Sequence, residues 1–306
     1  MNFSEAEIIE VVAEIFRSPD PRIELGIGDD AAVITTSRRT VITTDTAVEG
    51  THFNASWSGA FDIGRKITAA NLADVYAMGA VPSFLVVALT LTGDESVEWI
   101  SELAEGIVHE ARSCGASVVG GDLTRGAIKV ISITALGEVD FPIVRSGAQA
   151  GDSIYISSLP GWSAAGMCVI DLEPTSDLAL HAISEFCAPT LDYSVAVDWA
   201  NENATSMCDV SDALITQAHQ IANSSMVQLN FDKSAFENSS EFAQLKEVAD
   251  SRDVDVWQWI IAGGEDHVFL ATGKDLSGLC VGKVSTGIGV TGLEMKKAPV
   301  TWRHFQ

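Results

Sequence analysis

The chain of 306 residues is 47% hydrophobic and 20% charged, the composition of a globular protein with a substantial core. Its 42 Asp and Glu residues far outnumber its 18 Lys and Arg residues, so the formal net charge is -24. This charge argues strongly against binding to nucleic acid or to an anionic membrane. An anionic substrate would need bound cations inside its site, because they reverse the local field.

The N-terminal segment is acidic and amphipathic, and it does not have the pattern of a secretory signal. No apolar run reaches the roughly 20 residues that span a bilayer. The five cysteines are scattered and form no Cys-x-x-Cys pair, which is typical of thiols in a reducing compartment. We therefore predict a cytoplasmic protein without a membrane segment or a zinc site.

In the first half of the chain, helices and strands are expected to alternate irregularly. Apolar periodicity predicts helices over residues 4–16, 62–78 and 96–113. Short apolar or alternating runs predict strands over residues 41–44, 84–91, 117–119 and 128–139. The first strand is expected to end at Asp45, and the third is expected to end before the two glycines that follow it.

A domain boundary is expected near residues 140–151, where FPIVRSGAQAGD precedes a new apolar run. The second half predicts helices from about 162 to 171, from about 178 to 201, at 239–250 and from Ser211 onward, with strands at 153–157, 226–231 and 267–272. The irregular order favours a mixed α/β (α+β) protein rather than a doubly wound sheet. We predict two domains, residues 1–145 and residues 146–306.

Acidic residues recur in segments rich in glycine and threonine. They are Asp29 and Asp30 in GIGDDAAVI, Asp45 in TTDTAVEGTHF, Asp74 in NLADVYAMGA, Asp122 in GGDLTRG, and Asp209 and Asp212 in DVSDALI. Most of them lie near apolar runs, where an unpaired carboxylate is costly to bury. Carboxylate and hydroxyl oxygens are the ligands that Mg²⁺ takes and shares with phosphates. The pattern therefore predicts a magnesium–phosphate enzyme.

Each motif also has an ordinary structural explanation. Asp30 would lie in a surface turn, Asp45 in a turn or helix N-cap, and Asp122 in a hairpin loop. Asp209 and Asp212 would cap the helix that follows them. The sequence has no P-loop, and no dinucleotide-binding glycine motif follows a strand. Only the joint occurrence of the motifs favours a functional explanation.

Taken in order, these segments resemble the thiamine-monophosphate kinase family, which shares a superfamily with aminoimidazole ribonucleotide synthetase and selenophosphate synthetase. The strings RSGAQAGD, GGED and the terminal TWRHF extend the resemblance over nearly the whole chain. The resemblance implies ATP-dependent phosphorylation of thiamine monophosphate to thiamine diphosphate, with several Mg²⁺ ions. It also implies a homodimer formed through the N-terminal domain, with ATP in a cleft between the two domains.

The resemblance further implies roles for individual residues. The metal ligands would be Asp30, Thr43, Thr44, Asp45, Asp74, Asp122, Asp209 and Asp212. ATP would contact Gly121, Asp122, Arg145 and Ser211, and thiamine phosphate would contact His52, Glu265 and Trp302. The acceptor phosphate is nucleophilic at neutral pH, so we assign no general base and expect direct in-line transfer assisted by Mg²⁺.

The chain departs from the family pattern in its C-terminal half. Ala213 replaces the glycine of Ser-Asp-Gly, which is expected to tighten that turn. Residues 216–220 lack the acidic residue usual in the helix that follows, and Arg303 replaces an expected Asp. These positions bear on ATP contacts in the second half and on acceptor binding.

Other activities of the superfamily are each disfavoured by an absence. The first cysteine is Cys114, so the reactive N-terminal cysteine of selenophosphate synthetase is missing. The chain ends in Phe305-Gln306 rather than in the cysteine of the hydrogenase-maturation relative. The purine-synthesis relative lacks the EGTHF string present here. A non-catalytic protein that binds divalent ions remains an alternative, and it predicts Mg²⁺ binding without ATP turnover.

Overall fold

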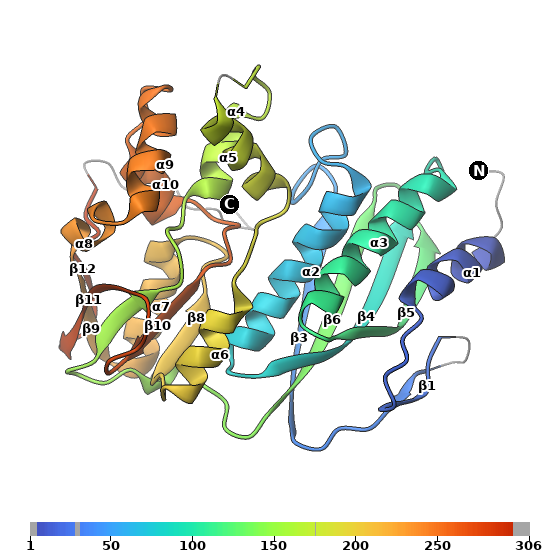
Figure 1. Cartoon of the computed structure of the whole chain (residues 1–306), viewed down its shortest axis with the longest axis horizontal. Coiled ribbons are helices and arrows are strands. Elements are labelled where there is room, and N and C mark those ends of the chain that lie inside the picture. The colour runs from blue at the N-terminus through green and yellow to red at the C-terminus, as the bar shows by residue number, and fades with distance from the viewer. Residues whose placement is uncertain (1–4, 28–30, 175, 296–306) are drawn as a thin grey trace. The chain divides into compact units, whose positions relative to one another are not determined.

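The computed structural model of the protein describes residues 5–27, 31–174 and 176–295. The chain forms two compact units: one comprises Met1–Val75 and Ala80–Phe141, and the other comprises Tyr76–Gly79 and Pro142–Gln306 (Figure 1). Each unit combines helices with at least one sheet. The predicted mixed α/β class is therefore confirmed.

The first unit is built on a four-stranded sheet with the strand order β3-β6-β4-β5. The strands are β3 (Arg39–Val48), β4 (Val81–Leu91), β5 (Ser117–Arg125) and β6 (Val130–Val139). Strands β4 and β5 are parallel, and the other neighbours are antiparallel. The remaining elements are α1 (Glu5–Phe16), α2 (Ala60–Ala77), α3 (Val97–Ser113) and the paired strands β1 (Ile23–Leu25) and β2 (Val33–Ile34).

The four-stranded sheet has one buried face and one half-exposed face. Along β6, Ile131, Ile133 and Ala135 are fully buried, whereas the residues between them are partly exposed. Helices α2 and α3 lie on the same side of the sheet (Figure 1). This alternation is typical of an antiparallel sheet that is covered on one side.

Helices α2 and α3 approach each other at two glycines. A Cβ at Gly64 would lie 2.3 Å from the backbone oxygen of Leu103, and a Cβ at Gly106 would lie 2.0 Å from that of Phe61. Both distances are shorter than any normal carbon–oxygen contact, so a side chain at either position requires the helices to separate. The two glycines therefore fix how closely α2 packs against α3.

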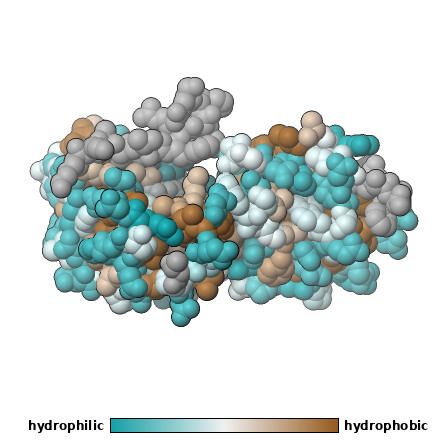
Figure 2. All heavy atoms as spheres, turned by 90° about the horizontal axis from the view of Figure 1, so that it is seen from above, coloured by the Kyte–Doolittle hydropathy of each residue, from teal (hydrophilic) through white to brown (hydrophobic). Residues whose placement is uncertain are grey.

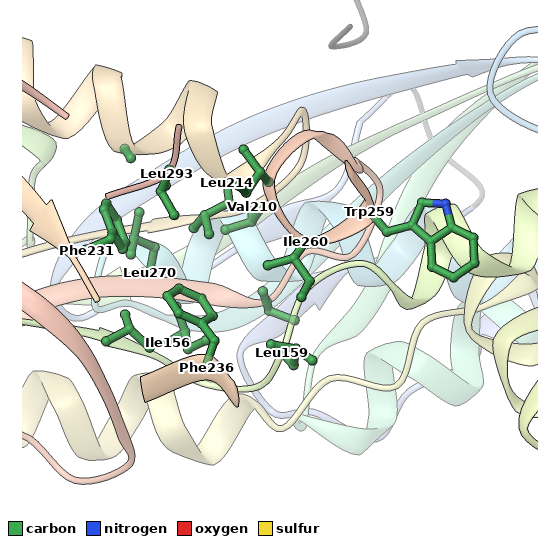
Figure 3. Close-up of a cluster of buried hydrophobic side chains, with 14 of the residues drawn as sticks. Ile156, Leu159, Val210, Leu214, Phe231, Phe236, Trp259, Ile260, Leu270 and Leu293 are labelled. Atoms are coloured by element: carbon green, nitrogen blue, oxygen red, sulfur yellow. The ribbon is translucent and has the colours of Figure 1, made fainter. Parts of the chain in front are cut away.

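The second unit is built on a six-stranded sheet with the order β12-β9-β11-β7-β10-β8, in which β9 and β12 are parallel and the other neighbours antiparallel. Its strands are β7 (Ser153–Ile156), β8 (Ser206–Asp209), β9 (Val227–Phe231), β10 (Phe269–Gly273), β11 (Leu279–Thr286) and β12 (Gly289–Thr291). Its helices are η1 (Arg145–Gly147), α4 (Trp162–Val169), α5 (Asp177–Cys187), α6 (Tyr193–Asn201), α7 (Leu214–Ser225), α8 (Lys233–Glu237), α9 (Ser240–Asp250) and α10 (Val256–Ala262). Side chains from the sheet and from several helices, including Ile156, Leu214, Phe236 and Ile260, form one buried cluster (Figure 3).

The single helix predicted from about 178 to 201 was wrong. The structure has two helices there, α5 and α6, separated by residues 188–192. Pro189 cannot continue a helix, because it lacks a backbone N–H and its ring crowds the preceding turn. Asp192 then starts α6 by accepting a hydrogen bond of 3.0 Å from the Ser194 N–H.

The face drawn in Figure 2 is mostly hydrophilic, with hydrophobic residues in small patches. Among the described residues, no helix has both the length and the apolar character required to cross a membrane.

Candidate active site

Three of the predicted metal ligands meet between β3 and α2. Thr43 and Asp45 are two residues apart on β3, so their side chains lie on the same face of the strand, and both residues are partly buried. The Thr43 hydroxyl donates a hydrogen bond of 2.7 Å to Asp74 Oδ2 on α2. The Thr43 hydroxyl and the Asp74 carboxylate are thereby in contact, with Asp45 two residues along on the same face of β3, and such oxygen donors suit a hard cation such as Mg²⁺.

Asn71 connects α2 to the strand that carries these ligands. Its side chain is fully buried, its Oδ1 accepts the Asp45 N–H at 3.2 Å, and its Nδ2 donates to the Ile67 carbonyl at 2.9 Å. Strand β3 is an edge strand, so Asn71 takes the place of a neighbouring strand at this one N–H. Sequence analysis does not predict a site role for Asn71, although an amide residue on an otherwise apolar helix face is a detectable signal.

Asp45 lies within β3, so the prediction that the strand ends there was wrong. The pairing with β6 continues to Val48, which lies opposite Val130. Two side-chain hydrogen bonds add to the pairing of β3 with β6. Thr44 Oγ1 donates to the Ile133 carbonyl at 3.1 Å and also accepts from Thr134 Oγ1. Thr44 alternates with Thr43, so the structure does not bring its side chain to Asp45 and Asp74.

Gly121 and Asp122 also lie within a strand. The predicted strand end at residue 119 was wrong, because β5 pairs with β4 up to Arg125. A Cβ at Gly121 would lie 2.0 Å from the Val87 carbonyl oxygen, so glycine permits this close pairing. At the end of β5, Arg125 donates to the Thr92 carbonyl at 3.2 Å.

Asp122 is exposed on the edge strand opposite to the one that carries Asp45. Strands β6 and β4 lie between them, and the spacing of neighbouring strands puts the two positions roughly 14 Å apart. The structure therefore does not bring Asp122 together with Asp45 within this unit.

His52 follows β3 in a short loop of the first unit. Its Nδ1 accepts the Val48 N–H at 3.1 Å. A nitrogen that accepts a hydrogen bond carries no proton, so the neutral ring holds its proton on Nε2. The ion pair between Lys129 and Glu49, at 3.0 Å, supports the same loop. A histidine in this tautomer can donate through Nε2 to a phosphate oxygen.

In the second unit, Asp209 and His267 form a buried pair. Asp209 ends β8 and is 2% exposed, and its Oδ2 lies 2.9 Å from Nδ1 of His267, which is 6% exposed. The His267 N–H also donates to the Val210 carbonyl at 2.9 Å. This carboxylate therefore has a protein partner, which sequence reasoning did not assign.

Residues 211–213 form a turn that brings Ser211 and Asp212 close to Glu265. The Glu265 N–H donates to the Ser211 carbonyl at 2.6 Å. A Cβ at Gly264 would lie 2.7 Å from that same carbonyl oxygen, so the close approach needs glycine. Ala213 has φ 176 and ψ 150, an extended backbone that any residue adopts. The turn therefore does not depend on the conformational freedom of the glycine that Ala213 replaces.

Asp266, next to Glu265, anchors helix α4. Its carboxylate is buried and accepts the N–H groups of Gly161 and Ser163 at 2.8 and 2.9 Å, at the start of that helix. Burial raises the pKa of Asp266 from 3.8 to about 6, because desolvation of the charge outweighs these two hydrogen bonds. Asp266 thus fixes the start of α4 relative to the segment that carries Glu265.

The raised pKa of Asp266 predicts a pH signature in the free energy of unfolding. The protonated acid is favoured in the folded chain, so its contribution is full below about pH 4 and is lost as the pH rises through about 6. Compared with Asp266→Asn, which does not titrate, the wild type should lose on the order of 3 kcal/mol over this interval. Urea unfolding of both proteins at several pH values measures it. A difference that stays constant from about pH 4 to pH 7 would contradict the raised pKa.

Arg145 lies on η1 in the second unit and is exposed. Its carbonyl accepts the Ser225 hydroxyl at 2.7 Å, and a Cβ at Gly147 would lie 1.8 Å from the Thr205 carbonyl oxygen. The backbone of η1 is thus held on both sides.

Two predicted site residues, Asp30 and Trp302, lie outside the described residues. Within the part of the chain that the structure describes, no group of three or more His, Cys, Asp or Glu side chains is arranged to hold a metal ion. The oxygen cluster of Thr43, Asp45 and Asp74 contains two carboxylates and a hydroxyl, so further ligands would have to complete a magnesium site.

The fold and these motifs have counterparts in known proteins. Residues 28–139 match the domain described as AIR synthase related protein, N-terminal domain. The first unit therefore contains a domain of this class. A thiamine-monophosphate kinase of Corynebacterium glutamicum is 34% identical over 280 residues, covering 89% of this chain and 82% of that protein. One from Mycobacterium tuberculosis is 36% identical over 252 residues, covering 81% and 74%.

Solved structures agree with the sequence relatives. The structure of AaThiL complexed with AMPPCP and TMP has a TM-score of 0.81 and 27% identity, covering 100% of this chain and 99% of that chain. The chain belongs to the thiamine-monophosphate kinase family.

Proposed function

We propose that the protein phosphorylates thiamine monophosphate to thiamine diphosphate with ATP as the phosphate donor. Family membership supports the reaction, and a similar structure contains AMPPCP and TMP. The observation that carries the proposal in this chain is the oxygen cluster of Thr43, Asp45 and Asp74, which is built between β3 and α2. A chain with a net charge of -24 needs cations at such a place to admit two anionic substrates.

We propose several Mg²⁺ ions as these cations: Asp45 and Asp74 with Thr43 would hold one of them, and Asp30, Thr44, Asp122, Asp209 and Asp212 would be ligands of others. Bound Mg²⁺ would neutralise charge on both phosphates and so permit their approach. The Asp74 carboxylate is held by the Thr43 hydroxyl on β3, and the backbone of Asp45 is held by Asn71 on α2, so both residues are positioned by the other element.

The remaining side chains bind and orient the two substrates in this proposal. Gly121, Asp122, Arg145 and Ser211 contact ATP, and His52, Glu265 and Trp302 contact thiamine phosphate. Transfer is direct and in line, without a general base, because the acceptor oxygen is already anionic. Radioactive phosphate that stayed on the protein after acid quenching of a single turnover would contradict direct transfer.

The test of the function is turnover of ATP with thiamine monophosphate, with the product identified by its mass. We expect thiamine diphosphate in the presence of Mg²⁺, and loss of turnover in excess EDTA with recovery on adding Mg²⁺. Turnover with a different phosphorylated acceptor would keep the reaction type and replace the substrate. Mg²⁺ binding without turnover of any acceptor would favour the non-catalytic alternative.

We further propose a homodimer formed through the half-exposed face of the four-stranded sheet. Ile42 is 65% exposed on that face, beside the hydroxyl residues Thr44, Thr46, Ser132 and Thr134. An exposed sheet face with a large apolar residue suits contact with an identical face. Sedimentation velocity over a range of concentrations tests this, and a monomer at every concentration would refute it.

Two other predictions stay proposals. The domain division at residues 145 and 146 is one of them. The other is the cytoplasmic location, which the scattered spacing of the five cysteines supports.

A further inference from the structure

Gln217 lies in the first turn of α7 and bridges the two ends of the turn at 211–213. It is 1% exposed. Its Oε1 accepts the Ala213 N–H at 3.1 Å, and its Nε2 donates to the Ser211 hydroxyl oxygen at 3.3 Å. Burying an amide costs desolvation free energy, which hydrogen bonds at both ends offset. A buried amide with both ends hydrogen-bonded also fixes the geometry of its partners.

The chemistry of the partners fixes the orientation of this amide. A backbone N–H can only donate, so the end of Gln217 that faces Ala213 must be the oxygen. The other end is then the NH₂ group, which can only donate, so the Ser211 hydroxyl oxygen must accept. A hydroxyl has one proton, and this contact leaves the proton of Ser211 for another acceptor.

We propose that Gln217 is a positioning residue that keeps Ser211 as a hydrogen-bond donor toward a phosphate group of ATP. The inference rests on the proposed function, in which Ser211 contacts ATP. An ionised glutamate of the same length would still accept the Ala213 N–H, but its second oxygen would accept the Ser211 proton. It would also put a negative charge beside Asp212 and the bound phosphates.

The backbone of the turn is held independently of Gln217. The Glu265 N–H donates to the Ser211 carbonyl, and the flanking residues Val210 and Leu214 are fully buried in the core of the second unit (Figure 3). Substitution of Gln217 should therefore change the side-chain hydrogen bonds of the turn while the fold persists.

The test is a double-mutant cycle of Gln217→Glu and Ser211→Ala, with affinity for Mg²⁺–AMPPCP by calorimetry and the KM for ATP and for thiamine monophosphate by turnover. We expect Gln217→Glu to weaken AMPPCP binding and to raise the KM for ATP about 10-fold, the loss of one hydrogen bond to a charged group. The KM for thiamine monophosphate should stay within about twofold. In the Ser211→Ala background, the effect of Gln217→Glu should be at least about fivefold smaller.

Two further variants separate positioning from general effects of charge and stability. Gln258→Glu, at an exposed position on α10, adds the same charge and should leave ATP affinity unchanged. Gln217→Met removes both hydrogen bonds without adding an acceptor for the Ser211 proton. It should lower the melting temperature but weaken ATP binding less than Gln217→Glu does.

The outcomes distinguish this inference from the proposed function. If Ser211→Ala weakens ATP binding but Gln217→Glu does not, the inference is wrong and the function stands. Equal effects of Gln217→Glu with and without the Ser211 hydroxyl would also overturn it. If Ser211→Ala changes neither affinity nor KM, the ATP contact assigned to Ser211 fails and the inference fails with it. A wild type that neither binds AMPPCP nor turns over ATP refutes the function itself.

Discussion

Replacing Asp45 by asparagine should lower kcat by about 1000-fold, which corresponds to about 4 kcal/mol of lost transition-state stabilisation. Asparagine keeps the size of the side chain and the backbone N–H that Asn71 accepts, so the strand and the fold should persist. The negative charge that would hold Mg²⁺ beside Asp74 is lost. Steady-state turnover of ATP and thiamine monophosphate at saturating Mg²⁺ measures the effect.

The matched control for Asp45→Asn is Asp94→Asn, the same chemical change at an exposed position of the same unit. It should leave kcat within about twofold of the wild type, since surface charges act weakly through solvent. An Asp45→Asn enzyme that keeps more than about a tenth of the wild-type kcat would show that this carboxylate does not hold an essential ion.

Replacing Gly106 by alanine should lower the free energy of unfolding by about 3 kcal/mol, the upper range for overpacking. The new methyl group would meet the Phe61 backbone oxygen at 2.0 Å, so α3 would have to move away from α2. Alanine is the better helix former by about 1 kcal/mol, and the steric cost must exceed this gain. Denaturant unfolding followed by far-UV circular dichroism gives the value.

Gly59→Ala is the control for this packing effect. Among the described residues, apart from its chain neighbours, none comes within 4 Å of a Cβ at Gly59, just before α2, so the substitution should change stability by less than about 0.5 kcal/mol. Equal stability losses for the two variants would mean that the contact between α2 and α3 does not limit packing. Because α2 also carries Asp74, Gly106→Ala should reduce turnover even under conditions where the protein stays folded.

The fold class could be predicted because many of its helices and strands depend on local patterns of the sequence. The helix predicted at 96–113 is α3 (Val97–Ser113), because its apolar stripe and its Ser96 cap are local features. The strands that carry Asp45 and Asp122 were predicted too short. Threonines and glycines were interpreted there as strand ends, but cross-strand pairing with β6 and β4 keeps both segments extended. Such partners come from distant parts of the chain, and local propensity does not contain them.

Some residues of the candidate site could likewise be predicted from the sequence, and others could not. The sequence suggested the oxygen-bearing residues Thr43, Asp45 and Asp74, which the structure brings together. It did not indicate that Asn71 holds the backbone of Asp45 or that Gln217 holds the turn at Ser211. The buried partner of Asp209, His267, was also missed, since a single polar residue in an apolar run has many explanations. These residues act through contacts that depend on the folded geometry.

Glu265, Asp266 and His267 are consecutive, and each makes a different contact. The first holds the turn through its backbone, the second holds the start of α4, and the third holds Asp209. Inserting or deleting one residue here would shift all three contacts together, so no single compensating substitution could restore them. As family members diverge, changes of length should therefore be rare in this segment and gather in surface loops instead.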